Sequence, residues 1–145
     1  MSYRPSLRGS YRLRQAATVA GALVVMVGAG LPWSQGTRDI SPFHLSLKWL
    51  FGRAAGTDAD PVKSIGMVIL LLVGVIVFGL VTAGRGITIV GGVGAVLVPL
   101  AFALSVIRTS RPLFDVLGLG VYLTVVGGAI AITGTVLGAG ARRRR

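Results

Sequence analysis

The chain contains no cysteine and no glutamate, and its 145 residues include only four acidic side chains. The absence of cysteine excludes disulfides, thiolate catalysis, iron–sulfur clusters and cysteine-ligated zinc. Proton-coupled transport through a small bundle needs a carboxylate within the membrane. The four acids, Asp39, Asp58, Asp60 and Asp115, all lie outside the long apolar runs of the chain. These absences argue against coupled transport and against most catalysis within a membrane.

Charge is also missing from four long apolar runs, which are Ala16–Leu31, Ile65–Ala83, Ile87–Ile107 and Val116–Ala141. A helix rises about 1.5 Å per residue, so runs of this length can cross a hydrocarbon core of about 30 Å. The chain is 53% hydrophobic and only 13% charged, with no room for a separate soluble domain. We therefore predict an all-α membrane protein, a four-helix transmembrane bundle of antiparallel spans that forms one membrane domain over residues 1–145.

The charged flanks of the runs give the expected boundaries. Spans are predicted at about 16–33, 63–83, 87–107 and 114–139, with an outer loop at 34–62 and basic tails at 1–15 and 140–145. The short turn Gly84-Arg85-Gly86 makes the second and third spans antiparallel neighbours. An alternative for the first run is a cleaved signal peptide, with Gly28 and Gly30 before the cleavage site. Its removal would leave the orientation of the other spans unchanged.

The outer loop holds a segment of ambiguous periodicity. Ser41-Pro42 is typical of a helix cap followed by proline at the first helical position, and Gly52 is a plausible stop. These signals predict a short interfacial helix at Pro42–Phe51, which buries Phe43, Leu47, Leu50 and Phe51. The segment also alternates like a strand, but a lone strand would lack a partner, so we favour the helix. Asp60-Pro61 repeats the cap signal and is expected to begin the second span.

The cations are distributed unevenly about the predicted spans. One side holds nine and no acid: Arg4, Arg8, Arg12, Arg14, Arg85 and Arg142–Arg145. The other side holds six cations and all four acids. The positive-inside rule then places both termini in the cytoplasm of a bacterial plasma membrane and loop 34–62 outside. The inner arginine clusters would contact the anionic inner leaflet of the bilayer. No nucleic-acid motif accompanies the net charge of +11, so we expect no nucleic-acid partner.

Small residues recur at a spacing of four within the runs. The pairs are Gly134 with Gly138, Thr124 with Gly128, Gly91 with Ala95, and Ala17 with Gly21. Close backbone approach is a main source of helix association in lipid, so these faces are predicted to pack within the chain or on another protein. The hydroxyls within the runs are expected to bond back to their own helix or to a neighbour. Trp33 and Trp49 are expected as anchors at the membrane interface.

No group of side chains predicts a reaction. His44 has neither the spacing of a nucleophilic triad nor enough further metal ligands, and Asp58-Ala59-Asp60 lacks the oxygen ligands of a cation loop. Asp115 suits the first turn of a helix. We therefore assign no catalytic, cofactor-binding or metal-binding residue and expect no enzyme and no cofactor.

The pattern instead favours a non-catalytic accessory or structural subunit of a larger membrane assembly, which binds a membrane protein partner or further copies of itself. The first alternative is a small oligomeric pore or carrier of the holin type, in which the glycine-rich faces close around a ring. The second alternative is a membrane enzyme that uses residues of the outer loop.

Three short motifs occur along the chain. The first run ends in Gly30-Leu31-Pro32-Trp33, the turn Gly84-Arg85-Gly86 joins the middle runs, and Gly120-Val121-Tyr122-Leu123 opens the last. In this layout the chain resembles small four-span actinobacterial membrane proteins of unknown function. The resemblance covers the whole chain and implies a four-span fold. It implies no activity, and no functional residue is transferred from it.

Overall fold

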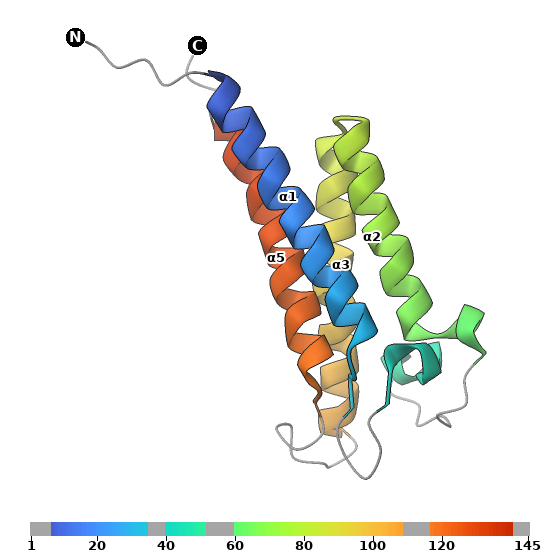
Figure 1. Ribbon diagram of the computed structural model, residues 1–145. Coiled ribbons are helices and arrows are strands. Elements are labelled where there is room, and N and C mark those ends of the chain that lie inside the picture. The colour runs from blue at the N-terminus through green and yellow to red at the C-terminus, as the bar shows by residue number, and fades with distance from the viewer. Residues whose placement is uncertain (1–6, 35–39, 52–59, 109–116, 141–145) are drawn as a thin grey trace.

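The computed structural model describes residues 7–34, 40–51, 60–108 and 117–140. Within them the long helices are α1 (Leu7–Gly30), α2 (Ile65–Val81), α3 (Arg85–Arg108) and α5 (Leu119–Gly140) (Figure 1). The described residues form isolated β-bridges but no strand, so the expected all-helical class is confirmed. Three helices are long and apolar enough to cross a membrane, over Arg12–Gly30, Arg85–Arg108 and Leu119–Val136; α2 is apolar but has 17 residues.

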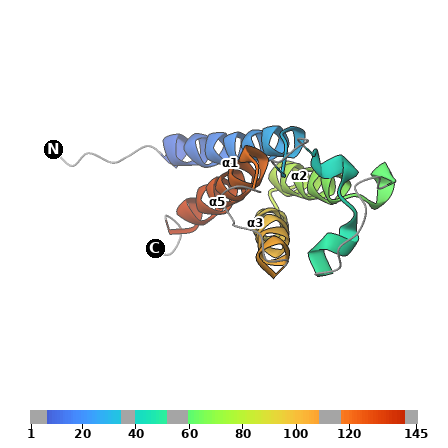
Figure 2. The same cartoon turned by 90° about the horizontal axis from the view of Figure 1, so that it is seen from below.

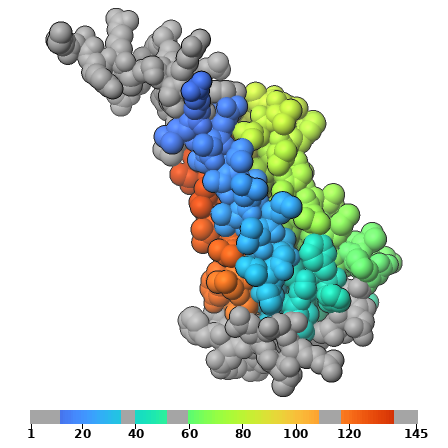
Figure 3. All heavy atoms as spheres, in the orientation of Figure 1, coloured from blue at the N-terminus to red at the C-terminus, as the bar shows by residue number. Residues whose placement is uncertain are grey.

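Consecutive long helices run in opposite directions and form a ring. α1 packs against α5, α5 against α3, α3 against α2, and α2 against α1, with the most extensive contact between α1 and α5 (Figures 1 and 2). In the space-filling view, α1 covers the front of the bundle, with α5 on one side and α2 on the other (Figure 3). The first turns of α1, the α2–α3 turn and the last turn of α5 therefore lie at one end of the bundle (Figure 1).

Two helices begin away from the edges of their apolar runs. α1 starts at Leu7, inside the expected polar tail, because arginine is a good helix former and charge does not end a helix. α5 starts at Leu119, where the chain is bound to the segment that follows α1. The Gly118 N–H donates to the Trp33 carbonyl at 2.9 Å, and the Gly120 N–H donates to the Pro32 carbonyl at 3.2 Å. These bonds fix the junction between the first and last helices.

Asp60-Pro61 does not begin α2, which corrects the sequence prediction. The pair begins a short 3₁₀ helix, Pro61–Lys63, in which the Asp60 carboxylate accepts from the Val62 N–H at 3.3 Å. Ser64 is the N-cap of α2, and its hydroxyl oxygen accepts from the Met67 N–H at 3.2 Å. Two caps therefore follow one another, and the second is the one from which the long helix extends.

The predicted single helix at Pro42–Phe51 is also corrected. Two 3₁₀ helices, Pro42–His44 and Leu47–Phe51, are separated by Leu45 and Ser46. The Leu45 carbonyl accepts from the Ile65 N–H at 2.9 Å, and Ser46 forms a bridge with Ser64, so this stretch is held extended. Leu45 is consequently buried in the core, whereas Phe51, expected on the buried face, is 81% exposed. Leu47 and Leu50 are partly buried against the core, as expected.

The connection between α2 and α3 has the three-residue length of the predicted glycine turn but lies two residues earlier, at 82–84. α2 ends at Val81, the N–H of the C-cap Thr82 donates to the Phe78 carbonyl at 2.9 Å, and Arg85 is already the first residue of α3. Ala83 makes the reversal in the left-handed region, with φ of 53°. A side chain disfavours this region, so the turn closes at some cost in backbone energy.

Most of the apolar core lies at the end of the bundle away from Arg12 and Arg85. Its larger cluster includes Trp33, Leu45 and Phe102, and the two rings of Trp33 and Phe102 have centroids 5.5 Å apart. A second, smaller cluster, which consists of Ala22, Ile76 and Ala131, lies where α1, α2 and α5 meet. Tight packing is therefore concentrated near the loop 34–62 side.

Candidate functional site

The backbones of α1 and α5 touch along a seam of glycines. Gly21 and Gly28 lie seven residues apart on α1, and Gly120, Gly127 and Gly134 are spaced by seven on α5. A Cβ on Gly28 would lie 2.5 Å from the Thr124 hydroxyl oxygen, and one on Gly127 would lie 2.6 Å from the Val25 nitrogen. A period of seven keeps residues on one face of two wrapped helices. The seam therefore has no space for a side chain at these glycines.

Ala17 and Gly21, one of the predicted small pairs, both lie on this seam. A Cβ on Gly21 would lie 2.6 Å from the Ala131 nitrogen, and one on Gly134 would lie 2.9 Å from the Ala17 Cβ. The surroundings of Gly138, the predicted companion of Gly134, lie outside the described side chains. This part of the predicted packing surface is used inside the chain.

The two residues of the pair Thr124 and Gly128 contact different neighbouring helices. Thr124 faces Gly28 of α1, whereas a Cβ on Gly128 would lie 2.9 Å from the Gly92 carbonyl oxygen of α3. Four residues turn a helix by about 40° beyond a full turn, so in a ring of helices such a pair can contact two partners.

The pair Gly91 and Ala95 divides in the same way. A Cβ on Gly91 would lie 2.7 Å from Ile76 of α2, while the Ala95 Cβ lies 3.2 Å from the position of a Cβ on Gly128 of α5. The two members of each of these pairs therefore face different helices.

Gly28, Gly120 and Gly127 are not among the residues predicted from a spacing of four, although a spacing of seven relates Gly28 to Gly21 and Gly127 to Gly120 in the sequence. Gly79, where a Cβ would lie 2.5 Å from the Thr88 hydroxyl oxygen of α3, is not among the predicted residues either. These glycines make the α1–α5 and α2–α3 contacts possible, because helices without side chains between them approach most closely.

The threonine hydroxyls inside the bundle bond to the carbonyl four residues earlier, as predicted. Thr18 donates to the Arg14 carbonyl at 3.0 Å, Thr124 to that of Gly120 at 2.7 Å, and Thr135 to that of Ala131 at 2.9 Å. Thr82, Thr88 and Thr133 do the same. Their protons are therefore engaged within single helices, and they form no hydroxyl chain between helices.

Trp33 lies inside the protein, an environment different from that of a lipid-facing anchor. It is fully buried, its indole N–H donates to the Gly28 carbonyl at 3.1 Å, and its ring packs on Phe102. Trp49 is partly buried, with its ring centroid 6.4 Å from that of Phe102. Trp33 thus ties the end of α1 to α3, and Trp49 covers the same ring from the loop side.

The polar residues that were weighed as reactive groups lie apart from the seam. His44 is exposed in the first 3₁₀ helix, and Asp60 is used as a cap. Asp39, Asp58 and Asp115 lie outside the described residues. Within residues 7–34, 40–51, 60–108 and 117–140, no three His, Cys, Asp or Glu side chains come together as metal ligands would.

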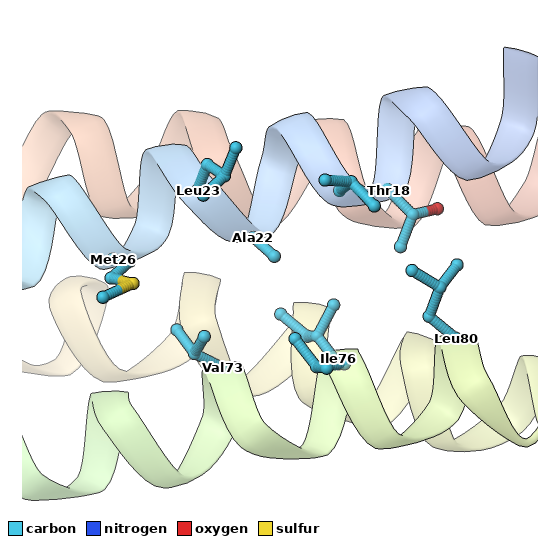
Figure 4. Close-up of a pocket in the computed structure, with 9 residues that line it drawn as sticks. Thr18, Ala22, Leu23, Met26, Val73, Ile76 and Leu80 are labelled. Atoms are coloured by element: carbon cyan, nitrogen blue, oxygen red, sulfur yellow. The ribbon is translucent and has the colours of Figure 1, made fainter.

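A groove of about 220 Å³ runs between α1 and α2, where the ring of helices is least tightly closed. Thr18, Ala22 and Ile76 are buried along its floor, while Leu23 and Val77 are 57% and 45% exposed. Thr18 and Leu80 lie at one end, and Met26 and Val73 at the other (Figure 4). The groove is a concave apolar surface of the described bundle.

Comparison with known protein families, with curated proteins and with solved structures finds no match to this chain. The resemblance to small four-span actinobacterial membrane proteins therefore stays a prediction.

Proposed function

We propose that the chain crosses a bacterial plasma membrane four times, with both termini in the cytoplasm. α1 and α3 run in the same direction, so a chain that crosses in both must return between them, and α2 is the segment available for the return. Its 17 residues rise by about 26 Å, which is close to the core thickness of about 30 Å. Arg12 and Arg14 lie in the first half of α1 and Arg85 begins α3, and these two helices begin at the end of the bundle that the positive-inside rule assigns to the cytoplasm (Figure 1).

Within this membrane the proposed role is that of a non-catalytic accessory or structural subunit. The observation that supports it most is the kind of polar side chain that is buried inside the bundle. Apart from the indole N–H of Trp33, the buried polar side chains of the described residues are hydroxyls, namely those of Thr18, Ser64, Thr88, Ser105, Thr124 and Thr135. Ion pathways and proton relays in membranes use ionisable side chains that face the interior. The interior is suited to holding four helices together rather than to moving a charge.

The partner surface in this proposal is an outer helix face, because the described seam glycines are occupied within the chain. The outer face of α3 carries Val90, Leu97 and Leu104, which are 65%, 58% and 57% exposed. The outer face of α2 carries Leu71 and Phe78, which are 61% and 59% exposed. Both faces are apolar, and either can pack against a helix of another protein by van der Waals contact.

Native mass spectrometry of the tagged chain, extracted from its own membrane in mild detergent, tests this role. We expect a discrete complex of fixed stoichiometry above the 15.0 kDa monomer. One of two double variants, Leu97→Ala with Leu104→Ala or Leu71→Ala with Phe78→Ala, should release the partner while the other retains it. These side chains are exposed, so both variants should fold. A stable lone monomer would contradict the proposal.

The pore alternative is separated by ion flux from liposomes that contain the purified chain. An accessory subunit should give no flux at any potential or lipid composition. The direct backbone contact between α1 and α5 supports this expectation, because the seam glycines are packed within the chain and do not face another copy. Steady flux above that of empty liposomes would favour the pore instead.

Retention of the cellular phenotype in His44→Ala would count against the enzyme alternative.

A further inference from the structure

The groove between α1 and α2 has the chemistry of a lipid site. We propose that it binds an anionic phospholipid, with one acyl chain in the groove and the phosphate group at the end near Arg14 and Arg85. The inference goes beyond the accessory role and shares with it only the placement of the bundle in a membrane.

The lining of the groove favours a hydrocarbon guest. Of its nine described lining residues, Thr18 alone carries a polar side-chain atom, and that hydroxyl already donates to the Arg14 carbonyl at 3.0 Å. The floor offers buried apolar contacts, and the rims at Leu23, Met26 and Val77 are 57%, 55% and 45% exposed. A guest with polar groups along its length would lose hydrogen bonds there, whereas a methylene chain loses none.

The length of the groove matches a chain from one leaflet. From Thr18 to Met26 the lining covers about two turns of α1, which rise by about 12 Å. This is somewhat under half of a hydrocarbon core of about 30 Å. A membrane helix of a partner protein would need contact along the whole core, so an acyl chain fits the groove better than a helix does.

The charge at one end of the groove selects the headgroup. Arg14 precedes Thr18 by one helical turn on the same face of α1, and Arg85 follows the short turn after α2, beyond Leu80. Asp60, the acid within the described residues, caps the 3₁₀ helix that precedes α2, and α2 begins at the opposite end of the bundle (Figure 1). Arginine binds phosphate oxygens through paired N–H groups. An anionic headgroup at the Arg14 end is therefore favoured over a zwitterionic one.

Native mass spectrometry of the full chain in bilayer discs of mixed phosphatidylglycerol and phosphatidylcholine tests the site. The wild type should retain one phosphatidylglycerol in preference to phosphatidylcholine. Ala22→Phe fills the floor of the groove and should abolish this retention. Ala20→Phe makes the same change at an exposed position of the same helix and should retain the lipid. Circular dichroism and gel filtration report whether each variant is folded.

A second pair of variants leaves the groove untouched. Arg14→Gln and Arg85→Gln should each lower the preference for phosphatidylglycerol over phosphatidylcholine by roughly fivefold, the effect of one cation at an anionic surface. These variants decide the question if Ala22→Phe does not fold.

Equal retention of the two lipids by the wild type, or unchanged retention by folded Ala22→Phe, would overturn the proposal. A dimer that Ala22→Phe dissociates would assign the groove to a second copy instead. Loss of the lipid site would leave the accessory role intact, because the partner complex is measured separately.

Discussion

Gly28 and Thr124 face each other across the α1–α5 seam so closely that a side chain on Gly28 would collide with Thr124. A Cβ on Gly28 would lie 2.5 Å from the Thr124 hydroxyl oxygen and 2.8 Å from the Thr124 nitrogen. The Thr124 hydroxyl is held by the Gly120 carbonyl at 2.7 Å, and the Gly28 carbonyl accepts from the Trp33 indole. Gly28 thus allows the close contact of α1 with α5 because it has no side chain, and its carbonyl holds Trp33 in the core.

Substitution of Gly28 by alanine should therefore destabilise the bundle by about 1–3 kcal/mol, because the new methyl group meets backbone that cannot move aside. Gly74→Ala is the matched control, since a Cβ on Gly74 would meet nothing within 4 Å in the middle of α2. It should stabilise the protein by about 0.5–1 kcal/mol through the helix preference of alanine. Reversible unfolding in mild detergent measures both. Equal effects of the two substitutions would show that the seam is not closely packed.

Trp33 should stabilise the fold through both its packing and its hydrogen bond. Trp33→Phe keeps most of the contact with Phe102 but loses the bond to the Gly28 carbonyl, and should cost about 1 kcal/mol. Trp33→Ala should cost about 3–5 kcal/mol, since it empties a fully buried site. The free energies of unfolding of the two variants, compared with that of the wild type, give both losses. Similar losses for both would mean that the ring packing contributes little.

Substitution of Ala83 by glycine should stabilise the protein. Its φ of 53° lies in the left-handed region, which costs a residue with a side chain about 1–2 kcal/mol relative to ordinary helical backbone. Ala83→Gly should therefore raise the stability by about 1 kcal/mol, since glycine occupies this region without a clash. Thermal unfolding in detergent measures the gain, and Gly74→Ala gives the opposite exchange at a position without strain. A loss of stability in Ala83→Gly would show that the turn does not hold Ala83 in the left-handed region.

The helical class could be predicted from the sequence because charge-free runs of this length have few other structures. The loop segment at 42–51 could not, because its outcome depends on a distant residue. The carbonyl of Leu45 pairs with the N–H of Ile65, and no local pattern shows that contact. The cap signal at Ser41-Pro42 and the lack of a partner for a lone strand then favoured a continuous helix, which placed Phe51 on its buried side.

The packing residues could be predicted only in part. Small residues at spacing four were found, and Ala17 and Gly21 do lie together on the seam with α5. Thr124 and Gly128 contact different helices, since the direction of each residue depends on the order of four helices around the ring. The groove between α1 and α2 could not be predicted for a related reason. It is lined by one row of side chains from each helix, and the alignment of the two rows depends on how the helices pack.

The four-span arrangement depends most on α2, so the most direct test asks whether its two ends lie on opposite sides of the membrane. The chain has no cysteine, so Val62→Cys and Ala83→Cys each introduce a single thiol at an exposed position. In intact cells, a membrane-impermeant maleimide should label Val62→Cys at once and Ala83→Cys only after the cells are permeabilised. Labelling of both variants from the same side would contradict the four-span bundle.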